Sequence, residues 1–314
     1  MKERKCDLLV IGSGPAGMTA AIYAARSGLD TLILESTGAG GQILSTSEIE
    51  NYPGFTSISG AELAMKLGEQ VEHCGVETIY DEVSSVSLQG DKKTIICHET
   101  TITAKAIIIA TGASPRKIGC EGEEKFLGAG IHFCALCDGA FYKDKDIIVA
   151  GGGNSAVEEV LYLSPIAKSI TVVNMMPKFN AFAYLIEKLE NLPNVKVFHN
   201  TEITAVSGDK KLESIKTSDG KIIPCDGIFV AIGRKPNTAF LGDSVELAVG
   251  GYLAVNSKLE TNISGVFGAG DVCEKLVRQI VTACSDGAIS ATHAAEFIRS
   301  LKNFSDSGGK PPPS

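Results

Sequence analysis

The most regular pattern in the chain is an apolar run that ends in a glycine-rich turn and leads into a helical repeat. Residues 8–11 are all apolar, and Gly12, Gly14 and Gly17 follow at the spacing Gly-x-Gly-x-x-Gly. Apolar positions then recur with helical spacing, and a second strand-like run covers residues 31–34. Short apolar runs bounded by turn residues are typical of buried strands, and the spacing between them is typical of an amphipathic helix. We therefore predict a strand, a helix and a second strand in this segment.

The same pattern returns near the middle of the chain. Residues 147–150 form an apolar run, Gly151, Gly153 and Ala156 repeat the spacing of the first turn, and residues 170–173 form a second strand-like run. Internal repetition of this kind indicates two copies of one structural unit. The chain is therefore predicted to hold two β–α–β units of the same type.

The glycines of such a turn have mechanical roles in binding a dinucleotide. One glycine allows the tight turn, one lets the backbone approach a pyrophosphate, and the last lets the helix pack closely on the strand. The helix N-terminus then presents free N–H groups and a partial positive charge to the phosphates. In the first copy Glu35 ends the second strand and is placed to hold a ribose hydroxyl, whereas the second copy has Asn174 at that position.

Segments near both ends of the chain complete the first unit in our interpretation. Residues 106–112 and 265–272 each form a strand-like run that includes a glycine turn. We predict an α/β fold with two Rossmann-like, dinucleotide-binding domains, the second inserted into the first. The first domain would comprise residues 1–116 and 245–314, and the second would comprise residues 117–244.

The composition agrees with this interpretation and narrows the class of protein. The 314 residues are 44% hydrophobic and 21% charged, which is typical of a globular chain with room for about two domains. The net charge of −8 argues against nucleic acid as the main partner. No apolar leader precedes the first strand and no long apolar run occurs, so we expect a cytoplasmic protein with no membrane segment. The Gly-, Pro- and Ser-rich tail at 306–314 is predicted to be disordered.

Two of the nine cysteines form a Cys-x-x-Cys pair at Cys134 and Cys137. Thiols at this spacing exchange readily with a disulfide, and the placement lowers a thiol pKa. A zinc ribbon would need a second pair with similar spacing, which the chain lacks. His132 lies two residues before the pair, but a single histidine is more often packed or hydrogen-bonded than a metal ligand. We therefore predict a redox pair, no metal site, and seven other cysteines that serve as small buried or incidental side chains.

Together these motifs resemble the flavoprotein pyridine-nucleotide disulfide reductases. The sequence Cys-Ala-Leu-Cys-Asp-Gly at 134–139, just before the second glycine turn, is similar to the low-molecular-weight thioredoxin reductases, and the resemblance covers nearly the whole chain. It implies that FAD binds to the first domain and that a homodimeric enzyme reduces thioredoxin. The implied FAD-binding residues are Gly12, Ser13, Gly14, Pro15, Ala16, Gly17, Glu35, Gly41, Gln42, Asn51, Thr111, Gly112, Gly270, Asp271, Arg278, Gln279 and Ile280.

The resemblance also assigns roles at the dithiol. It implies that Cys134 and Cys137 are catalytic, that Cys137 faces the flavin, and that Asp138 exchanges a proton with a thiol. An aspartate at this position is also typical of a helix cap, so both roles stay open for Asp138.

The second glycine turn departs from the family pattern. Members that use NADPH end the second strand with a His-Arg-Arg cluster followed by another arginine, and these side chains bind the 2′-phosphate. Residues 173–180 here read Val-Asn-Met-Met-Pro-Lys-Phe-Asn, and Lys178 is the only cation among them. A hydrogen bond to a charged partner contributes about 1.5–3 kcal/mol, so the loss of two lowers affinity by about 10²–10⁴-fold. Asn174 also lacks the carboxylate expected for NADH.

We therefore predict that reduced ferredoxin, rather than NADPH, supplies the electrons. A flavin can accept electrons singly and transfer them as a pair to a disulfide. The pattern resembles the donor-atypical branch of the thioredoxin reductases, which includes ferredoxin-dependent flavin enzymes. Three alternatives remain open: an NADPH-dependent thioredoxin reductase with an atypical nucleotide site, an FAD-dependent dithiol oxidase that uses oxygen, and a non-enzymatic redox sensor. The intact dithiol motif disfavours the sensor.

Overall fold

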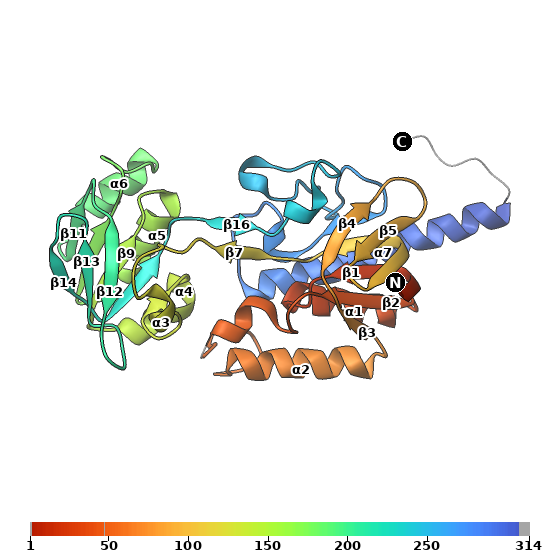
Figure 1. Ribbon diagram of the computed structural model, residues 1–314, viewed down its shortest axis with the longest axis horizontal. Coiled ribbons are helices and arrows are strands. Elements are labelled where there is room, and N and C mark those ends of the chain that lie inside the picture. The colour runs from red at the N-terminus through yellow and green to blue at the C-terminus, as the bar shows by residue number, and fades with distance from the viewer. Residues whose placement is uncertain (1, 47, 308–314) are drawn as a thin grey trace. The chain divides into compact units, whose positions relative to one another are not determined.

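The computed structural model describes residues 2–46 and 48–307, and Figure 1 shows its helices and strands. The chain divides into two compact units. Unit 1 comprises residues 1–114 and 235–314, and unit 2 comprises residues 115–234. Unit 2 is therefore inserted into unit 1, and the chain passes between them twice, along the paired strands β7 (Ala113–Pro115) and β16 (Arg234–Pro236).

The second boundary lies ten residues earlier than the sequence predicts, at residue 234 instead of 244. The backbone N–H of Asn237 donates to the carbonyl of Gly112 at 3.0 Å, and its side-chain Nδ2 donates to the carbonyl of Thr111 at 2.8 Å. Leu241 and Val245 are buried in the core of unit 1. Residues 235–244 therefore belong to unit 1 because that unit buries their apolar side chains.

Unit 1 is built on a seven-stranded sheet in the order β3-β2-β1-β6-β5-β4, with β17 also paired to β6. The strands β3, β2, β1, β6 and β17 run parallel, and β5 and β4 extend the sheet in antiparallel fashion. Besides β7 and β16, its elements are β1 (Lys2–Ile11), α1 (Pro15–Arg26), β2 (Thr31–Glu35), η1 (Gly41–Ser45), α2 (Gly60–His73), β3 (Glu77–Tyr80), β4 (Val83–Ser87), β5 (Lys93–Cys97), β6 (Thr100–Ile109), η3 (Ala239–Leu241), η4 (Val249–Gly251), β17 (Val266–Gly268), η5 (Gly270–Val272) and α7 (Ile280–Ser307).

The alternation of side chains along β1 separates two cores in unit 1. Leu8 and Val10 face one side of the sheet and pack with apolar side chains from α1, α2 and α7. Leu9 and Ile11 face the other side and pack with residues of β5 and of the segment after β16. Successive strand residues point to opposite faces, so a run of apolar residues in β1 buries both faces.

Unit 2 repeats this plan with a smaller sheet, whose parallel strands follow the order β11-β10-β9-β15-β8. Ile147 and Val149 face α5 and α6, whereas Ile148 and Ala150 face the antiparallel sheet β12-β13-β14. The elements are α3 (Glu123–Phe126), β8 (Ile131–His132), α4 (Ala135–Asp138), η2 (Gly139–Tyr142), β9 (Asp146–Ala150), α5 (Asn154–Leu163), β10 (Ser169–Val173), α6 (Ala183–Glu190), β11 (Val195–Phe198), β12 (Ile203–Ser207), β13 (Ser214–Thr217), β14 (Ile222–Pro224) and β15 (Gly227–Val230).

The predicted α/β class with two Rossmann-like units is confirmed. None of the described helices combines the length and the apolar character that a membrane span requires. Within the tail that the sequence predicts to be disordered, residues 306 and 307 close helix α7, and residues 308–314 lie outside the described part of the chain.

Candidate active site

The first glycine-rich turn joins β1 to α1 in unit 1. Gly12 has a φ of 104°, and a Cβ there would lie 2.5 Å from the carbonyl oxygen of Ala110. A Cβ at Gly17 would overlap the carbonyl oxygen of Gly12. By contrast, no described atom lies within 4 Å of the position that a Cβ of Gly14 would take. Gly12 and Gly17 therefore serve packing within the chain, and Gly14 leaves open space for a ligand to approach the backbone.

Helix α1 begins at this turn with free backbone donors. Gly14 is the N-cap residue, Pro15 occupies the first turn, and no side chain of the described residues caps the helix. The first turn of this fully described helix also carries no acidic side chain. Its exposed N–H groups and the partial positive charge of the helix end therefore suit the negative charge of a pyrophosphate.

Glu35 ends β2 with a fully hydrogen-bonded carboxylate. Its Oε2 accepts from the backbone N–H and the hydroxyl of Ser13, both at 2.8 Å. Its Oε1 accepts from the N–H groups of Ser36 and Thr37 at 2.9 and 3.0 Å and from the Thr37 hydroxyl at 3.1 Å. Burial raises the pKa of Glu35, but the bonds from Thr37 and Ser13 outweigh burial and lower this pKa overall. Glu35 therefore holds the glycine-rich turn against β2, a structural role that the sequence alone does not reveal.

Several other predicted FAD-binding residues gather around the same turn. A Cβ at Gly41 would lie 3.2 Å from the Cα of Gly14, and one at Gly270 would lie 2.8 Å from the Cβ of Ala16. Both glycines have positive φ angles. The start of η1 and the start of η5 therefore approach the turn so closely that a side chain at either position would crowd it.

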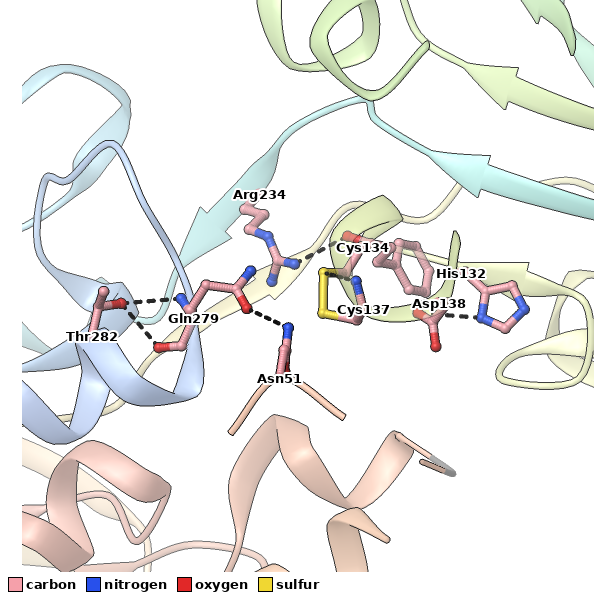
Figure 2. Close-up of a disulfide and its surroundings, with 9 residues drawn as sticks. Asn51, His132, Cys134, Cys137, Asp138, Arg234, Gln279 and Thr282 are labelled. Carbon is pink, nitrogen blue, oxygen red and sulfur yellow. Dashed lines mark hydrogen bonds and ion pairs between the residues drawn. A yellow bond between two sulfur atoms is a disulfide. The ribbon is translucent and has the colours of Figure 1, made fainter. Parts of the chain in front are cut away.

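A second group of predicted FAD-binding residues lies in contact pairs. A Cβ at Gly112 would lie 3.7 Å from the side-chain nitrogen of Gln42. The Nδ2 of Asn51 donates to Oε1 of Gln279 at 3.2 Å (Figure 2). Thr111 is occupied differently, since its hydroxyl donates to the carbonyl of Asn237 at 2.8 Å.

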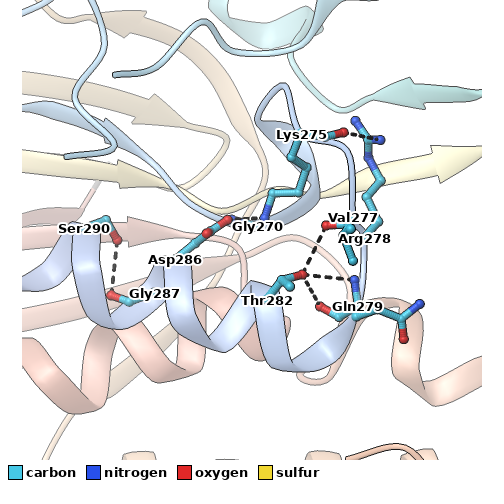
Figure 3. A network of polar contacts seen from close by, with 9 residues as sticks. All are labelled: Gly270, Lys275, Val277, Arg278, Gln279, Thr282, Asp286, Gly287 and Ser290. Atoms are coloured by element: carbon cyan, nitrogen blue, oxygen red, sulfur yellow. Dashed lines mark hydrogen bonds and ion pairs between the residues drawn. The ribbon is translucent and has the colours of Figure 1, made fainter. Parts of the chain in front are cut away.

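A polar network fixes the segment between η5 and α7 (Figure 3). Asp286 accepts from the backbone N–H of Gly270 at 2.9 Å and forms a half-buried ion pair with Lys275. The hydroxyl of Thr282 accepts from the N–H of Gln279 at 3.1 Å. The network holds the loop that carries the remaining predicted residues, which are Asp271 in η5, Arg278 stacked on Tyr252 at 4.4 Å, and Ile280 at the start of α7.

These features fit a flavin dinucleotide. The turn offers an approachable backbone at Gly14, and α1 offers uncapped donors for a pyrophosphate. Gly41 and Gly270, far apart in the chain, approach that turn, and the other segments that the sequence assigns to FAD belong to the same unit 1.

The second glycine-rich turn, in unit 2, keeps the same backbone geometry. Gly151 has a φ of 148°, and a Cβ there would overlap the carbonyl oxygen of Ala231. Helix α5 begins after Gly153, again with no capping side chain among the described residues. The scaffold of a dinucleotide site is therefore present in unit 2 as well.

The end of β10 differs sharply from such a site. Asn174 is buried, and its Nδ2 donates to the carbonyl of Lys178 at 3.1 Å and lies 3.1 Å from Nδ1 of His199. Its Oδ1 accepts from the backbone N–H of Met176 at 3.0 Å. The side chain is therefore bound to its own loop, and Met175 and Met176 beyond it are 62% and 58% exposed.

The Cys-x-x-Cys pair forms a disulfide in unit 2 (Figure 2). Cys134 is the N-cap of the short helix α4, and its sulfur accepts from the N–H of Cys137 at 3.2 Å. Both cysteines are partly exposed, and Leu136 between them is 53% exposed. Once reduced, a pair at the surface can attack the disulfide of another molecule, and its position at a helix N-terminus favours a thiolate.

Asp138 follows the disulfide and points to His132 (Figure 2). Its Oδ2 lies 3.4 Å from Nδ1 of His132, and Nε2 of His132 lies 2.7 Å from the hydroxyl of Tyr142. Asp138 makes no capping hydrogen bond with its side chain. The helix-cap role that the sequence left open is therefore wrong, because the carboxylate is turned toward the imidazole.

Sequence reasoning missed two residues that hold the backbone on either side of Cys134. Glu159 of α5 accepts a hydrogen bond from the N–H of Ala135, and Arg234 donates to the carbonyl of Phe133 at 3.2 Å. Burial raises the pKa of Glu159 to about 7, although Arg234 and the Ala135 N–H act in the opposite direction. The available signal was an acidic residue on the helix that follows the second glycine turn.

The other seven cysteines are unpaired thiols at buried or half-buried positions. Burial raises the pKa of Cys6, Cys225 and Cys273 to about 12. Thiols of this kind remain protonated and unreactive at neutral pH.

Comparison with known proteins agrees with this geometry. The sequence matches the pyridine nucleotide-disulphide oxidoreductase family over residues 6–287. It is 43% identical over 303 residues to a 34.2 kDa protein in the rubredoxin operon of Clostridium pasteurianum, with 95% of this chain and 98% of that protein covered. It is 42% identical over 308 residues to a thioredoxin reductase of Listeria innocua, with 96% of each chain covered.

Solved structures give the same result. The thioredoxin reductase from Streptococcus pyogenes matches with a TM-score of 0.89 and 39% identity, covering 94% of this chain and 99% of that one. A ferredoxin-flavin thioredoxin reductase from Clostridium acetobutylicum matches with a TM-score of 0.53 and 29% identity, covering 95% and 99%. The chain therefore belongs to the thioredoxin reductases of the pyridine nucleotide-disulphide oxidoreductase family, and it is an FAD-dependent oxidoreductase.

Proposed function

We propose that this flavoenzyme reduces the disulfide of thioredoxin, or of a thioredoxin-like protein, through Cys134 and Cys137, with electrons from reduced ferredoxin rather than NADPH. The observation that carries the choice of donor is the state of Asn174. All the polar atoms of its side chain are engaged within its own loop or with His199.

The loop after β10 supports this choice through its charge as well. A 2′-phosphate needs cationic or strongly donating side chains at the end of the second strand. Here the side chains after Asn174 are those of Met175, Met176 and Pro177, and the first cation is the exposed Lys178. The loss of two hydrogen bonds to a charged partner costs about 3–6 kcal/mol, so NADPH binding is expected to be weaker by about 10²–10⁴-fold than in a site that has them.

The dithiol supports the assignment of the substrate. In the exchange, a thiolate of the reduced pair attacks the disulfide of thioredoxin, the second thiol displaces it from the mixed disulfide, and the Cys134–Cys137 bond re-forms as thioredoxin leaves as a dithiol. Asp138 directly follows Cys137 in the sequence, and its carboxylate exchanges the proton of the attacking or leaving sulfur in this proposal. Both cysteines are partly exposed, as this exchange requires.

Ferredoxin, a one-electron donor, suits an enzyme that carries a flavin and a dithiol. When bound, FAD supplies the capacity to collect single electrons and deliver a pair. One solved structure that resembles this chain is that of a ferredoxin-flavin thioredoxin reductase. We also propose that the enzyme acts as a homodimer in the cytoplasm, as its sequence resemblance implies.

An anaerobic assay with three donors tests the proposal. The purified holoenzyme is mixed with NADPH, NADH or photoreduced ferredoxin, and the appearance of thioredoxin thiols is followed. We expect turnover with ferredoxin and at most about one hundredth of that rate with either nicotinamide. Comparable turnover with NADPH would instead establish an NADPH-dependent enzyme with an atypical nucleotide site. Oxygen consumption with a small dithiol, without thioredoxin turnover, would establish a dithiol oxidase.

A further inference from the structure

His132 occupies an unusual position beside the dithiol. It comes from β8, whose partner in the sheet is β15, while Asp138 ends α4 and Tyr142 ends η2. Three separate elements therefore bring together a carboxylate, an imidazole and a phenol, and the imidazole of His132 contacts both Asp138 and Tyr142. We refer to these three side chains as the His132 line. The side chains of His132 and Asp138 are only 11% and 13% exposed.

Aromatic packing holds the imidazole of His132 in place within the His132 line. The ring of Phe229, which is fully buried, stacks on His132 with 5.6 Å between centroids and an angle of 29°. Tyr142 meets both rings edge-on, at 5.2 Å from His132 and 5.3 Å from Phe229. A side chain at Gly227 would overlap the ring of Tyr142, so the glycine there leaves the space that Tyr142 fills.

We propose that His132 is a positioning residue that acts through Asp138: Asp138 passes the thiol proton of the dithiol pair to the imidazole and recovers it when the leaving thiolate needs it. This inference rests on the proposed disulfide exchange. A thiol of the reduced pair loses its proton to Asp138 and attacks the acceptor disulfide, and His132 holds that proton while the sulfur–sulfur bonds exchange. The proton then returns through Asp138 to the first departing thiolate of the acceptor. The second thiol of the pair gives up its proton by the same route when it attacks the mixed disulfide, and that proton goes to the second thiolate, so the two protons and the electron pair are both accounted for.

The chemistry of the three groups explains why the imidazole is needed. The ordinary pKa of an imidazole is about 6.5 and that of an aspartate is about 3.9, whereas a free thiol has a pKa of about 8.5. A proton taken from a thiol is therefore held several hundred times better by an imidazole than by an isolated carboxylate.

Tyr142 can serve the imidazole in both states. Burial, followed by the negative charges of Asp138, Asp226 and Cys225, raises the pKa of Tyr142 to about 12, so its hydroxyl keeps its proton. The oxygen of this neutral hydroxyl accepts a hydrogen bond from Nε2–H of the imidazole in both the neutral and the charged ring. In the neutral ring Nδ1 therefore carries no hydrogen, and it faces Asp138 as the atom that can accept the proton.

The charged residues nearby do not interrupt the contacts that link Asp138, His132 and Tyr142. Asp226 lies near Tyr142, and Phe229 from β15 brings no charge. Arg234 and Glu159 bind the backbone on the two sides of Cys134 and interact with each other electrostatically. The His132 ring therefore makes its polar contacts with Asp138 and Tyr142.

The test uses single-turnover exchange by holoenzyme that has been reduced with dithionite. The acceptors are oxidised thioredoxin and, separately, the small aromatic disulfide DTNB, and rates are measured from pH 6 to 9. The variants are His132→Gln, which keeps a hydrogen-bonding side chain but holds no proton, and Tyr142→Phe, which keeps the ring. FAD content and thermal unfolding confirm that each variant is folded.

We expect His132→Gln to lower the rate with thioredoxin about tenfold or more at pH 7 and to approach the parent rate at pH 9, where the thiol ionises unaided. An unchanged pH profile, or an equal loss at every pH, would overturn the inference. DTNB keeps this outcome separate from the proposed function. If thioredoxin is not the substrate but DTNB exchange still shows the His132 dependence, only the proposed function fails.

A second measurement removes the dependence on a variant. In ¹⁵N-histidine-labelled parent enzyme, the His132 signal is assigned by its loss in His132→Gln and is titrated in the disulfide and dithiol states. We expect the midpoint of the His132 titration to differ between the disulfide and dithiol states by at least half a pH unit, because the dithiol shares its proton with the His132 line. Identical titration curves in both states would contradict the proposal.

Discussion

The side-chain oxygen of Asn174 accepts a hydrogen bond from the backbone N–H of Met176 at 3.0 Å. The residue that should recognise a nucleotide is therefore a structural part of its own loop. The glycine turn that precedes it keeps the geometry of a dinucleotide site, so unit 2 combines the scaffold of such a site with an Asn174 that is bound within its own loop.

Restoring cationic side chains at this loop should restore NADPH use. We predict that Met175→Arg/Met176→Arg increases NADPH affinity by about 10- to 10³-fold, because each arginine can add a charge-assisted hydrogen bond to a 2′-phosphate. Titration of flavin fluorescence or absorbance with NADPH measures the change. Met65→Arg on α2 replaces a similarly exposed methionine of unit 1 and should leave the affinity unchanged. An equal gain for NADH would show that the arginines act through general charge and not through the 2′-phosphate.

The dithiol should be necessary for thioredoxin reduction but not for reduction of the flavin. We predict that Cys134→Ser and Cys137→Ser each lower thioredoxin turnover by at least about 10³-fold, since a hydroxyl cannot form the mixed disulfide. Donor-dependent bleaching of the flavin should persist in both variants. Cys74→Ser removes a half-buried thiol of unit 1 and serves as the matched control. Turnover that survives in Cys137→Ser would remove the pair from the mechanism.

Alanine substitutions at two glycines test whether the backbone at the first glycine-rich turn faces FAD. Neither Gly14 nor Gly68 has any described atom within 4 Å of the Cβ that alanine would add, and neither has a positive φ. We predict that Gly14→Ala lowers FAD affinity about tenfold or more, because its methyl group would enter the space of the pyrophosphate, whereas Gly68→Ala leaves FAD affinity unchanged. Isothermal titration of the apoprotein with FAD measures both. Equal FAD affinity in the two variants would place the cofactor elsewhere.

Glu159 should make stability fall as pH rises toward neutrality. Burial raises its pKa in the folded protein to about 7, whereas an unfolded glutamate titrates near about 4.3. Between these values the folded state binds more protons than the unfolded state, so the free energy of unfolding decreases with rising pH by up to about 3 kcal/mol. Above about pH 7 the loss is complete.

A pair of variants isolates this effect. Glu159→Gln cannot titrate, so its free energy of unfolding relative to the parent should rise by up to about 3 kcal/mol between pH 4.5 and 8. Urea unfolding at several pH values measures the difference. Glu158→Gln, on the exposed side of the same helix, should run parallel to the parent at all pH values. A parallel curve for Glu159→Gln would show that this carboxyl ionises normally.

Local sequence patterns predicted the two β–α–β units. Features that depend on contacts between residues far apart in the sequence could not be predicted. The glycine turns at Gly12 and Gly151 could be predicted because a strand, a turn and a helix are adjacent in sequence. The second domain boundary could not be placed, because it depends on the burial of Leu241 in the core of unit 1. The contact between His132 and Tyr142 likewise depends on how β8, α4 and η2 fold together.

The same distinction applies within the nucleotide site. From the sequence we predict that Asn174 does not bind a ribose or a 2′-phosphate. Only the structure shows that its amide is bound to Met176 and Lys178, which lie two and four residues further on. Glu159 was missed because its importance comes from the backbone of Ala135, a residue on another helix.

The rate at which each donor bleaches the bound flavin tests the central claim most directly. In an anaerobic stopped-flow experiment, the holoenzyme is mixed with reduced ferredoxin or with NADPH at equal concentration, and flavin absorbance is followed. We predict bleaching by ferredoxin at a rate sufficient for turnover and bleaching by NADPH that is at least about 100-fold slower. Bleaching by NADPH as fast as by ferredoxin would contradict the account.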